Sequence, residues 1–189
     1  MFIIPLAIVA IIAIYLVSFF NRLKTLQVRI KASIQEIGNQ LKRQAQLIPN
    51  LVESVKSYLK HEKGIFDKLT QARKLIETGS LKNLEKSQDL INKALGSLKV
   101  IVESNPQIQS QQLVGKMMEE LRDTADKIMY SRRTLIDLVA DYNTKIGTIP
   151  GIWLAPMFNL KPEQGLQTEN MGSALKVSQN DTKTPKVEI

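Results

Sequence analysis

The sequence predicts an all-α protein in which an N-terminal transmembrane helix continues into an elongated antiparallel bundle of three long helices. Three observations predict this fold class: an uncharged apolar run opens the chain, a seven-residue apolar repeat follows it, and two further segments of helical periodicity come after short breaks at Gly79 and Pro106. We expect an anchor over residues 1–21, a helical bundle with an apolar C-terminal cap over 22–160, and a disordered polar tail over 161–189.

The anchor is predicted from residues 2–20, which read FIIPLAIVAIIAIYLVSFF and carry no charge. A helix of this length, at about 1.5 Å per residue, spans the hydrocarbon core of a bilayer, which is about 30 Å thick. A cleavable signal peptide would have a basic start, a shorter apolar core and a small-residue cleavage site, and this run has none of them. An uncleaved, single-pass anchor is therefore the favoured interpretation.

Four bases flank the span on its C-terminal side, with no acid before Glu36: Arg22, Lys24, Arg29 and Lys31. The positive-inside rule then predicts that the rest of the chain is cytoplasmic. The chain has a net charge of +8, and a basic stripe runs from residue 22 to 60. Such a stripe suits anionic lipid, an acidic partner or simple solvation. It lacks interleaved aromatics and a known reading motif, so we expect no nucleic-acid partner.

The first long helix is predicted to run from about residue 2 to 78 and to carry an apolar stripe that other helices cover. Its stripe consists of Ile30, Ile34, Ile37, Leu41, Ile48, Leu51, Val55 and Tyr58, with the polar Gln44 interrupting it. Pro49 removes a hydrogen bond at a cost of about 3 kcal/mol in a helix interior, so we expect a bend near Pro49 or Gly64. Gly79 is the expected left-handed C-cap.

The same helix is predicted to extend beyond its neighbours, which would leave its membrane-proximal stripe uncovered. The candidate interaction stripe is Ile30, Ile34, Ile37 and Leu41. A second copy of the chain or another protein would then cover it. Gln27 and Gln44, the polar members of the stripe, either hydrogen-bond across the bundle, face water, or fix the register of the helices.

A motif of fixed polar offsets around a mid-helix proline lies in this helix. It comprises Gln40, Leu41, Lys42, Arg43, Ile48, Pro49, Asn50, Leu51, Val52, His61 and Glu62. This motif resembles the signature of the LemA family, which are membrane-anchored helical proteins of bacteria, some of them associated with magnetosomes. The resemblance implies a helical bundle at the bacterial inner (cytoplasmic) membrane or an organelle membrane, and it implies no particular chemistry.

Two more helices are expected, from about residue 81 or 83 to 104 and from about 110 to 146. In the latter, Arg132-Arg133 and Tyr142-Asn143 resemble the arginine-rich turn and the Tyr-Asn pair of the family. Residues 147–158 are strongly apolar but too short to span a bilayer, and they contain Trp153, the only tryptophan. This segment either caps the bundle or lies at a membrane or partner surface, where tryptophan is favoured.

No catalytic constellation is recognisable in the sequence. The chain has no cysteine and a single histidine, His61, so cysteine chemistry and histidine-cluster metal sites are excluded. The acidic cluster of Glu119, Glu120, Asp123 and Asp126 is interleaved with bases and is interpreted as a solvated face. We therefore expect no enzyme, cofactor or metal.

The leading hypothesis is that the protein is a non-enzymatic scaffold that presents a helical rod at the membrane. Such a scaffold would bind a protein partner or form a homo-oligomer. The alternative is a lipid-binding or membrane-remodelling module that acts through the basic stripe and the Trp153 segment.

Overall fold

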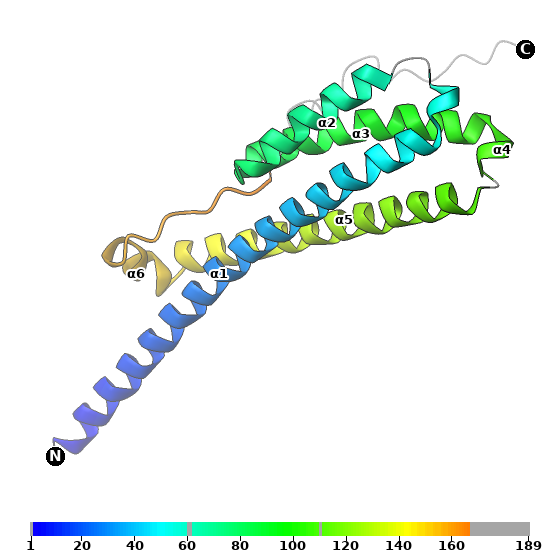
Figure 1. Cartoon of the computed structure of the whole chain (residues 1–189). Helices are drawn as coiled ribbons and strands as arrows, with labels where there is room; N and C mark the ends of the chain where they lie inside the picture. The colour runs from blue at the N-terminus through cyan, green and yellow to red at the C-terminus, as the bar shows by residue number, and fades with distance from the viewer. Residues whose placement is uncertain (1, 60–61, 110, 167–189) are drawn as a thin grey trace, which may run out of the picture.

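The computed structural model describes residues 2–59, 62–109 and 111–166, and within these ranges the regular elements are all helices (Figure 1). In chain order they are α1 (Ile3–Ser54), the short 3-10 helix η1 (Lys56–Tyr58), α2 (Glu62–Glu77), α3 (Leu81–Ser104), α4 (Pro106–Gln109), α5 (Gln112–Gly147) and α6 (Gly151–Met157). The predicted all-α class is confirmed, with a long apolar helix at the start of the chain.

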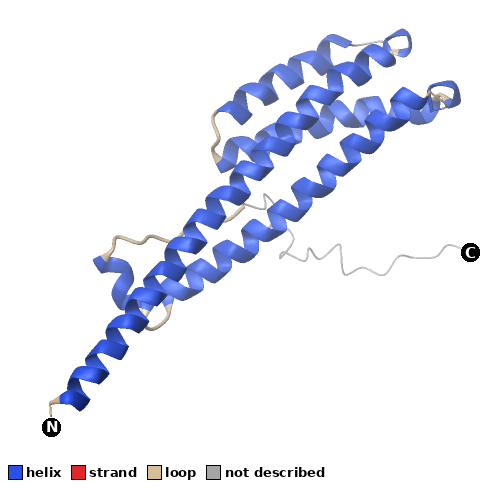
Figure 2. Ribbon diagram, turned by 60° about the horizontal axis from the view of Figure 1, so that its bottom comes forward, coloured by secondary structure: helices blue, strands red, loops and turns tan. Residues whose placement is uncertain are grey.

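Four helices form an elongated antiparallel bundle, as both ribbon views show (Figures 1 and 2). The C-terminal part of α1 packs along α5, and α2 and α3 form a hairpin that lies against α1. The N-terminal part of α1 projects beyond the bundle. α6 lies beside α1 at the end of the bundle from which this projection emerges (Figure 1).

The prediction of one helix through residue 78 is wrong. α1 passes through Pro49, ends at Ser54, and the chain reverses through η1 before α2 begins at Glu62. The reversal lets the apolar face of α2, which contains Ile65, Leu69 and Ala72, pack back into the core. The apolar repeat stays in phase across the reversal, which is why periodicity alone does not reveal it.

The prediction that the membrane-proximal stripe is uncovered is also wrong. Ile30, Ile37 and Leu41 are 2 %, 2 % and 0 % exposed within a single copy of the chain, and Ile34 is half-buried against the same core. The reason is the length of α5, whose last turns reach back to Gln27, near the end of the bundle from which α1 projects. No second copy is needed to cover these isoleucines.

The other boundaries follow the sequence closely. Gly79 has a φ of +64°, as expected of a left-handed cap, and Ser80 caps α3 by accepting a hydrogen bond from the N–H of Asn83. The polar tail expected from Lys161 begins with an ordered segment, because Asn143 exchanges two hydrogen bonds with the backbone of Glu163. Residues 167–189, the rest of that predicted tail, lie outside the described residues.

Candidate functional site

The first candidate site is the end of the bundle next to the candidate membrane span of α1, called the membrane end below. Among the described residues one helix, α1, is long and apolar enough to cross a membrane, and none of its apolar window is buried inside the fold. At the end of this window the ring of Phe20 lies 4.5 Å, centroid to centroid, from the ring of Phe158 just after α6. Lys24 places its ammonium 5.4 Å from the centre of the Phe20 ring. The apolar run and the C-terminal segment therefore meet at one level.

The four flanking bases follow that level within the next 11 residues of α1. Arg22, Lys24, Arg29 and Lys31 are all exposed. Lys24 donates a 3.3 Å hydrogen bond to Gln27, and none of the four forms an ion pair with an acid in the described part of the chain. Their charges are consequently free to interact with an external anion.

The segment after α5 both caps the bundle and exposes an apolar surface, so the two alternatives for it are not exclusive. Leu154, Ala155 and Leu160 are buried against the bundle core. The opposite side of the segment is solvent-facing and consists of five large apolar residues: Ile149, Ile152, Trp153, Met157 and Phe158. Trp153 is 65 % exposed, although it is the largest apolar side chain in the protein.

The proline motif has a structural explanation that the sequence did not reveal. Proline has no N–H, so the carbonyl oxygen of Ala45, four residues before Pro49, loses its usual helical donor. The guanidinium of Arg73, on α2, donates a 2.8 Å hydrogen bond to that oxygen. Because Ala45 is fully buried, this donor replaces a bond that water cannot supply. Pro49 thus creates the acceptor through which α2 is fastened to α1.

The remaining motif residues divide between core and surface. Leu41, Ile48, Leu51 and Val52 are fully buried in the core. Gln40 donates a 2.7 Å hydrogen bond to Glu36, and Arg43 forms a 3.5 Å ion pair with Glu120 on α5. Lys42 and Asn50 are exposed, Glu62 is the first residue of α2, and His61 lies outside the described residues. The motif therefore mainly specifies how α1 packs against α2 and α5.

Comparison with known proteins agrees with this motif. The sequence model of the LemA family matches residues 33–179, which is most of the chain. The chain belongs to the LemA family. No curated protein sequence matches it.

The Tyr-Asn pair of this LemA protein secures the membrane end of α5. Tyr142 is fully buried, and its hydroxyl accepts a 3.0 Å hydrogen bond from the amide of Gln27 on α1. Burial, and next the negative charge of Glu163, raise the pKa of Tyr142 above its usual 10.0, while the Gln27 hydrogen bond opposes the rise. Asn143 binds the backbone of Glu163 through bonds of 2.9 and 3.0 Å. The pair thus connects α1, α5 and the segment after α6.

The predicted arginine-rich turn is part of a continuous helix. Arg132 lies in the middle of α5 and donates a 2.5 Å hydrogen bond to Gln88 on α3. Gln44, the polar member of the stripe, is 2 % exposed and donates a 3.3 Å hydrogen bond to the carbonyl oxygen of Leu121 on α5. Of the alternatives for Gln27 and Gln44, hydrogen bonding across the bundle is the one observed.

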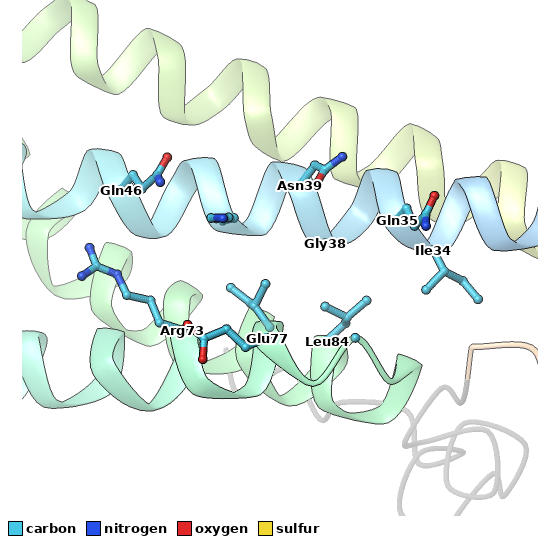
Figure 3. Close-up of a pocket in the computed structure, with 11 residues that line it drawn as sticks. Ile34, Gln35, Gly38, Asn39, Gln46, Arg73, Glu77 and Leu84 are labelled. Carbon is cyan, nitrogen blue, oxygen red and sulfur yellow. The ribbon is translucent and has the colours of Figure 1, made fainter.

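A groove of about 520 Å³ separates α1 from the α2–α3 hairpin (Figure 3). Its floor is apolar and its rim is polar; the lining comprises Ile34, Gln35, Gly38, Asn39, Lys42, Gln46, Arg73, Ile76, Glu77, Gly79 and Leu84. Figure 3 shows Arg73 and Glu77 on α2, across the groove from α1, which carries Gln35, Asn39 and Gln46. The opposed charges on this rim give it no strong preference for either sign of ligand.

Two members of the acidic cluster of α5 form ion pairs with bases. Asp123 forms a 2.7 Å ion pair with Lys127, and Glu120 pairs with Arg43. Within the described ranges, no group of three histidine, cysteine, aspartate or glutamate side chains is arranged to hold a metal ion.

Proposed function

We propose that this LemA protein is a non-enzymatic, single-pass membrane scaffold that holds a helical bundle at the cytoplasmic face of a bacterial inner membrane or organelle membrane. The observation that carries the proposal is the continuity of α1, which runs as one helix from the exposed apolar segment into the bundle core. A continuous helix transmits the orientation of the anchor to the bundle, whereas a flexible linker would not. Positive charge after the span supports the cytoplasmic orientation.

The surface that meets a partner has to differ from the buried isoleucine stripe. On α5, Met129, Tyr130 and Ile136 are large apolar side chains that are more than half exposed. Tyr130 also lines a shallow groove between α1 and α5, together with Arg29 and Glu36. These exposed positions are the ones at which we expect contact with a protein, either a different one or a second copy.

Site-specific photo-crosslinking in native membranes tests the scaffold proposal. A photoreactive residue is introduced in place of Tyr130, Met129 or Ile136, and in place of the exposed Ser97 on α3 as the matched control. A scaffold should give the same discrete, identifiable adduct at the α5 positions and not at Ser97. Absence of any adduct at all exposed positions tested would contradict a scaffold role.

A second candidate function is a lipid-binding or membrane-remodelling module, and the four unpaired flanking bases favour it. Their charges would concentrate anionic lipid around the anchor, at about 1 kcal/mol per base near the surface. In vesicles that mix anionic and neutral lipids, the lipids next to the full chain should then be enriched in the anionic species. This enrichment should decrease as the salt concentration rises. Replacing Arg22, Lys24, Arg29 and Lys31 by Gln should abolish it. Equal lipid neighbours before and after the replacement would eliminate this candidate.

A further inference from the structure

We propose that α6 is an interfacial membrane helix, which inserts its exposed apolar side into the boundary between headgroups and acyl chains of the bilayer that α1 spans. The contacting side chains are Ile152, Trp153 and Met157 of α6, together with Ile149 before the helix and Phe158 after it. This inference rests on the proposed membrane anchoring and adds a second contact with the same membrane. The occupant of the exposed apolar side is thus lipid rather than protein.

The level of α6 relative to the span carries the inference. Phe20 is the last residue of the uncharged run, and its ring contacts Phe158 at 4.5 Å. A membrane that contains residues 3–20 of α1 therefore ends at the level of Phe158, the residue that follows α6. In Figure 1, α6 lies next to α1 at the point where the apolar projection leaves the bundle. The exposed apolar side is consequently within reach of the bilayer surface.

The composition of the segment suits that depth. Between Lys145 and Lys161 the chain carries no charged residue. Five large apolar side chains in this interval are exposed, with Trp153 and Met157 exposed by 65 % and 76 %. Tryptophan prefers the membrane–water boundary because its ring is apolar and its N–H still finds a polar partner there. Lys161 follows the segment and Arg22 follows Phe20 on α1, where anionic headgroups would be met, whereas Lys145 is paired with Asp141.

The opposite side of α6 is fixed to the bundle, so the apolar surface cannot turn inward. A Cβ at Gly151 would lie 1.8 Å from the carbonyl oxygen of Lys145, which means that only glycine permits this close approach. Leu154 and Ala155 of α6 are buried, and Leu160, which follows the helix, is buried too. The exposed side chains are therefore held outward by the fold itself.

Intrinsic fluorescence tests the proposal directly, because Trp153 is the only tryptophan. The full chain is reconstituted into phosphatidylcholine–phosphatidylglycerol vesicles, with and without lipids brominated near the top of the acyl chain, which quench only tryptophans at that depth. The control combines Trp153→Phe with Leu113→Trp. It places the reporter at an exposed position near the start of α5, 33 positions before Ile146 and thus about 50 Å up the helix at 1.5 Å per residue. Val100→Trp, at an exposed position of α3, is a second control in the same background.

The expected result is that Trp153 loses most of its emission in brominated vesicles and is poorly quenched by aqueous iodide, while both controls behave in the opposite way. Efficient iodide quenching of Trp153 without bromine quenching would overturn the proposal. Protection from both quenchers would overturn it too, because it would place a protein on this surface. Flotation of the vesicles separates the two proposals. If the chain floats with the vesicles but gives either of these quenching results, only the proposed α6 contact is wrong. If the chain does not float with the vesicles, the proposed membrane anchoring is wrong as well.

Discussion

The hydrogen bond between Arg73 and the carbonyl oxygen of Ala45 allows a sharp test of why a proline is tolerated inside α1. Arg73→Met keeps the aliphatic stem of the side chain but removes the donor and leaves a buried carbonyl oxygen without a partner. Hydrogen bonds to charged groups contribute about 1.5–3 kcal/mol, and because the arginine is largely exposed we expect this one to contribute at or below the lower end of that range, about 1–2 kcal/mol. For a chain of this size, that corresponds to a fall in Tm of about 2–8 °C.

The double-mutant cycle with Pro49→Ala decides whether the mechanism is correct. The N–H introduced by Pro49→Ala can donate to Ala45 in the usual helical manner, so Arg73→Met should cost less than about 0.5 kcal/mol in that background. The coupling energy, which is the difference between the two costs, should then be about 0.5–2 kcal/mol. Urea unfolding of the full chain in mild detergent, followed by circular dichroism, measures all four variants. Lys74→Met, at an exposed position on the same helix, is the matched control. An equal cost of Arg73→Met in both backgrounds would refute the reasoning.

Three further predictions concern the membrane end of the bundle. Ile37→Ala should destabilise the bundle by about 2–5 kcal/mol in urea unfolding, because Ile37 is 2 % exposed within one chain. If the substitution changed only the oligomeric state and not the stability, Ile37 would lie in an interface between chains and the burial within one chain would be contradicted. The pKa of Tyr142 is raised in the folded chain, so the unfolded chain loses this proton first as the pH rises above 10.0. The contribution of Tyr142 to the free energy of unfolding should therefore be constant up to that pH and should decrease as the pH rises through the folded-state pKa. Tyr142→Phe should make this decrease smaller. Asn143→Ala removes both bonds to Glu163, so limited proteolysis within residues 159–166 should accelerate while the bundle stays folded; an unchanged cleavage rate would contradict that role.

Much of the fold could be predicted from the sequence because it depends on local signals. Helical periodicity gave the α3 bounds and placed α5 to within two residues, and Gly79 ended α2 as a left-handed cap should. The reversal after Ser54 escaped prediction because its apolar residues remain in phase with the helices on both sides. A bend was predicted near Pro49, whereas α1 continues through this residue and ends five residues later, at Ser54.

The candidate site was less predictable because it depends on distances between segments remote in sequence. Whether Ile30 and Ile37 are covered depends on where α5 ends relative to α1, and this relation is fixed by the reversal that periodicity concealed. Arg73 has no distinctive sequence signal, since its role exists only once α2 folds back beside Ala45. The flanking bases and the Trp153 segment were recognisable, but their common level follows from the contact between Phe20 and Phe158.

The most direct test of the anchored, cytoplasmic bundle is a cysteine-accessibility measurement on whole cells. The chain has no cysteine, so Ser97→Cys introduces a single thiol at an exposed position of α3. Ser18→Cys, inside the apolar run, is the membrane-embedded control. A single-pass anchor with the bundle inside predicts that the thiol at position 97 is protected from an impermeant reagent in intact cells and labelled after lysis, while the control stays unlabelled in intact membranes. Labelling at position 97 in intact cells would place the bundle outside and contradict the proposed orientation.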